Sequence, residues 1–208
     1  MREVLQSLER LLKTNFSPVY DSLRKPVELE RIQVMNSALP GEISGDLCEL
    51  WHWHNGQNRY AAPLFAPCEF LSIECSVEEW KEDRRSEEKF GRECAWVSSL
   101  LPIFSFEGYS VCQFLPQKKR PSGAVYSREI SSDVVTMFAP SLEGFLKVLT
   151  EAYDKGLFET VESFSGEPDL ELDDDEFDAL RFKRFPELRK LRKGQTLFSV
   201  LHKYDELP

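Results

Sequence analysis

The stretch Leu39–Gln57, LPGEISGDLCELWHWHNGQ, sets the expectation for the fold of this chain. It predicts a helix that is entered through Pro40 and closed by Asn55 and Gly56. Asparagine and glycine adopt the left-handed backbone of a helix C-cap at low cost. Trp53 lies on the other side from Trp51 and should be partly exposed. The apolar face of this helix is formed by Ile43, Leu47, Leu50 and Trp51.

The segments on either side of this stretch are punctuated by prolines. The N-terminus, from Arg2 to Thr14, has leucines at helical spacing and predicts an amphipathic helix that docks on the domain or on a partner. It is too charged for a secretory signal. The segment from Phe16 to Val34 is expected to be irregular, and residues 58–68 are expected to form a loop.

Alternating apolar residues predict a mostly antiparallel sheet downstream. Glu107 and Gly108 lie between two such runs and are typical of a tight hairpin turn. The predicted strands are Glu69–Ile73, Trp96–Val97, Ile103–Phe106, Tyr109–Leu115, Ala124–Arg128 and Val134–Phe138.

Two more helices are predicted beside this sheet. Ser76 and Glu79 match a capping box, so a mostly charged helix should begin at Ser76 and reach Phe90. A second helix should end at Gly156. Its apolar face is formed by Leu142, Phe145, Leu146, Leu149 and Tyr153.

Charge is distributed unevenly along the C-terminal third. Residues 166–178 hold eight acidic residues and no basic one, and the part from Glu167 to Glu176 is expected to form a solvated acidic loop. Residues 179–208 hold eight basic and three acidic residues and predict a helical arm, basic outside, that ends at Gly194 and packs on the domain. The apolar residues of this arm are Phe177, Leu180, Phe185, Leu188 and Leu191.

The elements together predict an α+β fold in a single domain. A mostly antiparallel sheet is flanked by helices and followed by a C-terminal helical extension. Residues 1–35 are expected to supply an N-terminal helix and lead-in, residues 36–160 the core, and residues 161–208 the extension.

No pattern in the chain predicts catalysis, a metal or a cofactor. His52 and His54 are two residues apart, so on a helix they point away from each other and cannot share one ion. They are expected to interact with the carbonyl end of their own helix. The chain has no Gly-rich phosphate loop, no G-x-S-x-G and no H-E-x-x-H. Free thiols are expected at Cys48, Cys68, Cys75, Cys94 and Cys112.

The net charge of −10 bears on the class of partner. Nonspecific binding of nucleic acid draws its affinity from neutralised phosphates, so an acidic chain does not suit it. An acidic chain does suit the capture of a basic protein. No run of 18 apolar residues occurs, so no membrane span is expected.

The order of these motifs resembles the SUKH superfamily, whose founding members are Smi/Knr-type regulators of fungal cell-wall synthesis. The likeness extends from Leu39 to Phe158 and includes the W-x-W-H-N-G-Q ending and an S-L-x-x-F-L-x-x-L helix. One departure is the loop at residues 58–63, which lacks the acidic residue that many relatives carry there. The structural signature is Leu39, Pro40, Trp51, Asn55 and Gly56.

The resemblance implies a cytoplasmic, non-catalytic protein-binding module. Bacterial relatives are widely immunity proteins that neutralise a toxin, often a nuclease. The fungal relatives imply an alternative, a regulatory scaffold that binds endogenous partners, and an enzyme is a third hypothesis. A monomer or weak homodimer is expected. Candidate partner contacts are Trp53, Tyr60, Glu78, Glu79, Glu82, Asp83, Asp173, Asp174, Asp175 and Glu176.

Overall fold

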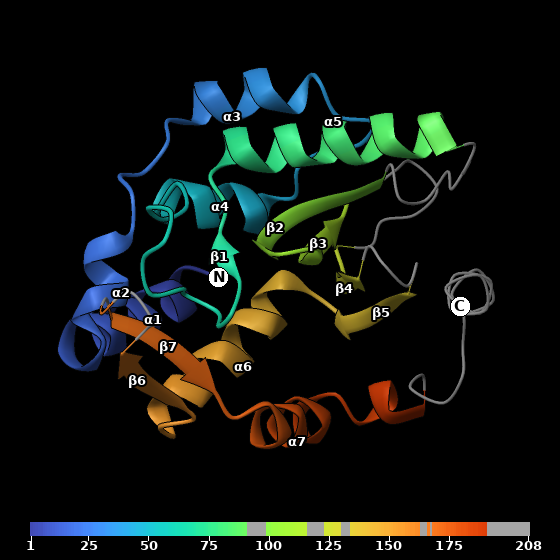
Figure 1. Cartoon of the computed structure of the whole chain (residues 1–208). Coiled ribbons are helices and arrows are strands. Elements are labelled where there is room, and N and C mark those ends of the chain that lie inside the picture. The colour runs from blue at the N-terminus through green and yellow to red at the C-terminus, as the bar shows by residue number, and fades with distance from the viewer. Residues whose placement is uncertain (91–98, 116–122, 130–133, 163–165, 167, 191–208) are drawn as a thin grey trace.

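A five-stranded antiparallel sheet in the order β1-β2-β3-β4-β5 forms the centre of the fold (Figure 1). The structure is a computed structural model, and it describes residues 1–90, 99–115, 123–129, 134–162, 166 and 168–190. The strands are β1 (Glu69–Phe70), β2 (Leu100–Phe106), β3 (Tyr109–Phe114), β4 (Val125–Glu129) and β5 (Val134–Ala139). A separate two-stranded sheet pairs β6 (Phe158–Glu162) with β7 (Pro168–Leu172).

Seven α-helices surround the sheets in the described part of the chain. They are α1 (Arg2–Asn15), α2 (Ser17–Ser22), α3 (Leu29–Asn36), α4 (Gly45–Trp53), α5 (Ile73–Phe90), α6 (Leu142–Asp154) and α7 (Asp174–Arg184). A 3-10 turn, η2 (Pro186–Lys190), follows α7. The predicted α+β class, with a mostly antiparallel sheet flanked by helices and a C-terminal helical extension, is confirmed.

Helices cover both faces of the central sheet (Figure 1). On one face lies α5, where the buried Ser76 hydroxyl donates to the carbonyl of Pro102 in β2. On the other face lie α6 and α7, where Phe138 of β5 packs against Phe145 and Phe177. The sheet is therefore the middle of three layers, and α5 and α7 are on opposite sides of it.

The predicted hairpin between β2 and β3 is confirmed. Glu107 and Gly108 both have positive φ, 39° and 89°, which is the backbone of a two-residue primed turn. The predicted strand at Trp96–Val97 lies outside the described residues.

The lead-in is more helical than the sequence predicts. The N-terminal helix is confirmed as α1, but the prediction that Phe16 to Val34 is irregular is wrong, because α2 and α3 fall there. Pro18 lies in the first turn of α2, where its fixed φ favours the helix and its missing amide costs nothing. Burial of Val19 and Ile32 against the core then holds these short helices in place.

The helix of the signature stretch is shorter than predicted at both ends. It begins after Ser44, whose hydroxyl accepts a hydrogen bond from the amide of Leu47 at 3.1 Å, and not at Pro40. It ends at Trp53, because His54 already has an extended backbone, and not at Asn55. Trp51 is fully buried, as predicted. The helix starts after Ser44 and not at Pro40 because the Ser44 side chain accepts a hydrogen bond from an amide that has no partner within the helix.

The predicted capping box at Ser76 is also wrong. Helix α5 begins three residues earlier, at Ile73, and the hydroxyl of Ser72 accepts from the amide of Cys75 at 3.2 Å. Strand β1 consequently ends at Phe70 instead of continuing to Ile73. Ser76 is buried and directed at the sheet.

The acidic segment is not the loop that was predicted. Its first half is strand β7, and its second half is the first turn of α7. Leu170 of β7 and Phe158 of β6 are both buried. This burial determines which face of the hairpin packs on the domain. Asp173 caps α7 by accepting a hydrogen bond from the amide of Glu176 at 3.0 Å. The acids are thus placed on a strand and a helix start, where they are ordered.

The helical arm packs on the domain through most of the predicted residues. The buried ones are Phe177, Leu180, Phe185 and Leu188. The arm is not uniformly basic outside, because Arg181 is only 5% exposed and turns inward. Leu191 and the predicted end at Gly194 lie outside the described residues.

Candidate protein-binding surface

The predicted contact acids form two groups on opposite sides of the sheet (Figure 1). Glu78, Glu79, Glu82 and Asp83 belong to α5, whereas residues 173–176 begin α7. The structure therefore does not bring the two groups into one surface, and each is considered separately.

The α5 acids are largely balanced by neighbouring bases. Glu78 lies 3.5 Å from the ammonium of Lys81 and 3.6 Å from the guanidinium of Arg85. Asp83 pairs with Arg128, which is buried in the sheet. Burial raises the pKa of Glu79 above its usual range, so this carboxylate is not a strong exposed charge. Glu82 is exposed. This helix therefore presents a surface on which acids and bases are interspersed.

The hairpin β6–β7 and the start of α7 form an uncompensated acidic surface. No lysine or arginine occurs from residue 156 to residue 180. Among the described residues, none of the carboxylates of this surface forms an ion pair. We call it the C-terminal acidic surface, and it consists of Glu159, Glu162, Asp169, Glu171, Asp173, Asp174, Asp175 and Glu176.

The strand register places like charges directly against each other. Glu159 of β6 is opposite Glu171 of β7, and both side chains are exposed. Like charges opposite each other across a strand pair are destabilising. On α7, the helix dipole compensates part of the repulsion among residues 173–176. Partial burial raises the pKa of Asp174, and the carboxylates of Asp178, Asp175 and Asp173 raise it further.

A groove of about 520 Å³ adjoins this surface, between α7 and the sheet. We call it the α7 groove. Its walls come from the Ala66–Pro67 turn, from the start of β3, from β4 and β5, and from the first two turns of α7. Tyr109, Ser127 and Thr136 line its sheet side, and Asp174 and Asp175 line its helix side.

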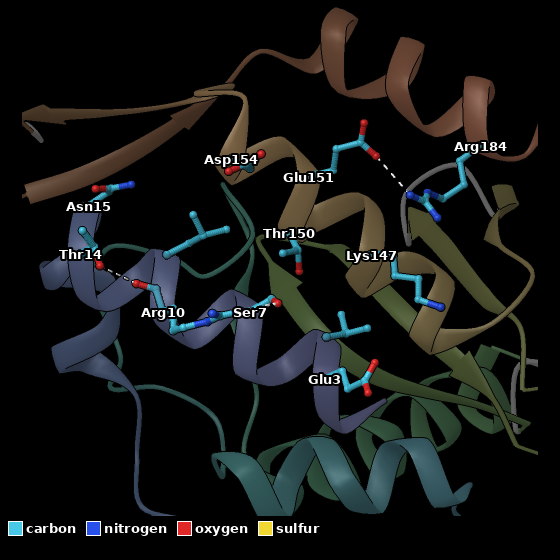
Figure 2. Close-up of a pocket in the computed structure, with 12 residues that line it drawn as sticks. Glu3, Ser7, Arg10, Thr14, Asn15, Lys147, Thr150, Glu151, Asp154 and Arg184 are labelled. Carbon is cyan, nitrogen blue, oxygen red and sulfur yellow. Dashed lines mark hydrogen bonds and ion pairs between the residues drawn. The ribbon is translucent and has the colours of Figure 1, made fainter.

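A second groove of about 700 Å³ runs between α1 and α6. Figure 2 shows Glu3, Ser7 and Arg10 of α1 on one side and Thr150 and residues 147, 151 and 154 of α6 on the other. We call it the α1–α6 groove. Its lining carries both signs of charge.

The charges of the α1–α6 groove are engaged with neighbouring groups. Arg184 of α7 closes one end of the groove and lies 3.2 Å from Glu151 (Figure 2). Lys147 pairs with Glu143 at 2.9 Å. The groove therefore carries two engaged bases, Lys147 and Arg184, beside the acids Glu3 and Asp154.

The two candidate aromatic residues have different environments. Trp53 is half-buried, as predicted, and its indole nitrogen donates to Glu9 at 3.3 Å. Tyr60 is 89% exposed and has a φ of 63°, a left-handed conformation that is unusual for a tyrosine. Its amide donates to Glu69 at 2.8 Å, which holds the turn.

The two histidines serve the packing of α4 on the lead-in. The Nδ1 of His52 lies 3.1 Å from the carbonyl of Val27, and that of His54 lies 2.7 Å from the carbonyl of Arg24. His52 lies in the last turn of α4 and His54 is its C-cap, and their ring hydrogen bonds go to carbonyls that are distant in sequence. No cluster of three potential metal ligands occurs within the described ranges.

The thiols are poor nucleophiles where the structure describes them. Burial raises the pKa of both Cys68 and Cys112 to about 12, so neither forms a thiolate at neutral pH. Cys48 and Cys75 are half-buried and free, and Cys94 lies outside the described residues. Within the described part of the chain, no hydrogen bond joins a thiol to a histidine.

Comparison with known proteins adds no assignment. No family model matches this chain, and no curated protein matches it. Within the described residues, no helix combines the length and the apolar composition needed to cross a membrane.

Proposed function

We propose that this protein is a non-catalytic binding module that captures a basic protein through the C-terminal acidic surface. The observation that carries the proposal is the pair Glu159 and Glu171, two exposed carboxylates that face each other with no base nearby in the chain. The pair lowers stability in the free protein. A partner with a basic surface removes that repulsion on binding, so the arrangement favours the complex.

The proposed biological role is that of a cytoplasmic immunity protein against a cognate toxin, with a basic nuclease as the expected target. This role is supported by the resemblance to the SUKH superfamily. Nucleases that grip nucleic acid carry a basic surface, and an acidic protein that covers this surface excludes the phosphate backbone. Opposite fields also accelerate encounter, which suits an inhibitor that must act before the toxin does.

The test uses toxin-domain proteins encoded beside the gene of this protein. Binding is measured by calorimetry, and inhibition is measured as loss of the toxin's own activity. We expect tight binding that weakens as salt rises. The variant with Glu159→Gln and Glu171→Gln should bind more weakly, whereas Glu78→Gln on α5 is the matched control and should bind normally. The absence of a tight basic partner among those neighbours contradicts the toxin role.

A second candidate function is a regulatory scaffold of the Smi/Knr type. Tyr60 supports it, because a tyrosine that is 89% exposed in a strained turn is typical of an interaction site. A protein with a second contact surface can hold two partners at once. Tyr60→Ala should then weaken binding of an endogenous partner while leaving capture of a basic protein unchanged.

A further inference from the structure

The α7 groove combines an aromatic floor with a carboxylate rim. The rings of Phe65, Phe138 and Phe177 border it and pack against one another, and they are 4%, 8% and 2% exposed, so only a small part of each ring faces the groove. The carboxylates of Asp174 and Asp175 line its outer part. An aromatic floor next to carboxylates suits a cation on an apolar stem, because the stem packs on rings while the charge meets oxygen.

The protein already holds one arginine in this way at the same place. The guanidinium of Arg181 lies 4.6 Å from the ring centroid of Phe138 and 4.3 Å from that of Phe182. It donates to Asp178 at 2.6 Å and to the carbonyl of Phe138 at 3.3 Å. These contacts engage Arg181, so it does not neutralise the outer rim.

The outer rim keeps its negative charge. No base within the described ranges pairs with Asp174 or Asp175. Repulsion from neighbouring carboxylates and partial burial both raise the pKa of Asp174, so its charged form is disfavoured in the free protein. A cation that enters the groove offsets the repulsion among these carboxylates and favours the charged form of Asp174.

We propose that the α7 groove receives a single arginine side chain of the basic partner, which makes it the anchor point of the C-terminal acidic surface. This inference rests on the proposed function and deepens it. Arginine fits better than lysine because its planar group binds carboxylates in a bidentate manner. The surrounding acids steer the partner, and the groove fixes its register.

The experiment uses two probes, acetylated and amidated hexa-arginine and hexalysine peptides, titrated into the whole protein by calorimetry. Thr136 is half-buried on β5 and lines the groove, so Thr136→Met fills it without changing charge. Thr150→Met is the matched control, because it places the same side chain in the α1–α6 groove. Ser127→Leu fills the α7 groove from β4 if Thr136→Met does not fold.

We expect hexa-arginine to bind the wild-type protein about tenfold more tightly than hexalysine, which corresponds to one bidentate carboxylate contact. Thr136→Met should abolish this preference, and Thr150→Met should leave it intact. Equal binding of both peptides, or a preference that survives in both filled variants, overturns the groove inference while capture by the acidic surface stands. If neither peptide binds the wild-type protein, the proposed function fails, and the groove inference fails with it.

Discussion

The side-chain oxygen of Asn55 accepts a hydrogen bond from the backbone amide of Ile73 at 2.9 Å. Ile73 is the first residue of α5, so Asn55 caps a helix that begins 18 residues later in the chain. The amide group of Asn55 also donates to Glu74 at 3.1 Å. The end of α4 and the start of α5 are therefore joined by one side chain.

Replacing Asn55 should destabilise the fold. Asn55→Ala leaves the buried amide of Ile73 without an acceptor, and the expected loss is about 1–2 kcal/mol of unfolding free energy. Chemical denaturation followed by circular dichroism measures it. Asn58→Ala is the control, because Asn58 is exposed and only its backbone is engaged, with the carbonyl of Ser22. Equal stability of the two variants would contradict the capping role.

Gly56 should tolerate no side chain. Its φ is 76°, and a Cβ atom there would lie 2.3 Å from the backbone nitrogen of Ser72. Gly56→Ala should cost about 3 kcal/mol or more, because the backbone of the turn and of residues 71–72 must separate.

Gly45→Ala provides the contrast on α4, where a Cβ atom meets nothing within 4 Å. This change should stabilise the protein by about 0.5–1 kcal/mol. Thermal unfolding of both variants checks the pair, and a stable Gly56→Ala protein would show that the close approach is not required.

Reversing one charge of the hairpin should increase stability and reduce binding. Glu171→Lys places a base opposite Glu159 and converts repulsion into attraction, a gain of about 0.5 kcal/mol. The same variant should bind a basic probe more weakly. Urea denaturation gives the first quantity and calorimetry with hexa-arginine gives the second. A variant that gains stability but binds as well as the wild-type protein would show that this hairpin does not take part in binding.

Stability should decline at acidic pH partly through Glu74. Burial raises the pKa of Glu74, but hydrogen bonds from Asn55 and Arg31 outweigh it and hold the pKa below its ordinary value. The folded pKa is lower than the unfolded one, so this contribution is present above the unfolded pKa and is lost as pH falls through the folded pKa.

Glu74→Gln should therefore flatten the acid side of the stability profile below about pH 4.5, where unfolded glutamate titrates. Melting temperatures measured from pH 3 to pH 7 for both proteins test this. Glu82→Gln, an exposed change on the same helix, is the comparison variant for the loss of one negative charge. A profile for Glu74→Gln that parallels the wild-type profile would show that Glu74 does not contribute to the loss of stability in acid.

Local chemistry explains which elements were predictable. The β2–β3 hairpin follows from Glu107 and Gly108 alone, since a two-residue turn between alternating runs has few alternatives. The amphipathic helices α1 and α6 follow from the spacing of their leucines. The candidate acids of α7 were found from charge, yet their placement on a strand and a helix start was not. Acidic runs have low strand propensity. Residues 168–172 form a strand because Leu170 is buried against the rest of the domain.

The sequence by itself determined the α+β class, the inward face of the main helices and the excess of acid near residue 170, because these depend on periodicity and composition. Only the tertiary structure decided what Asn55 and Gly56 do, since their partners Ile73 and Ser72 lie far along the chain. It also decided that the acids of α5 and α7 occupy opposite sides of the sheet. Charge is a property of composition, but a surface exists only once distant segments pack together.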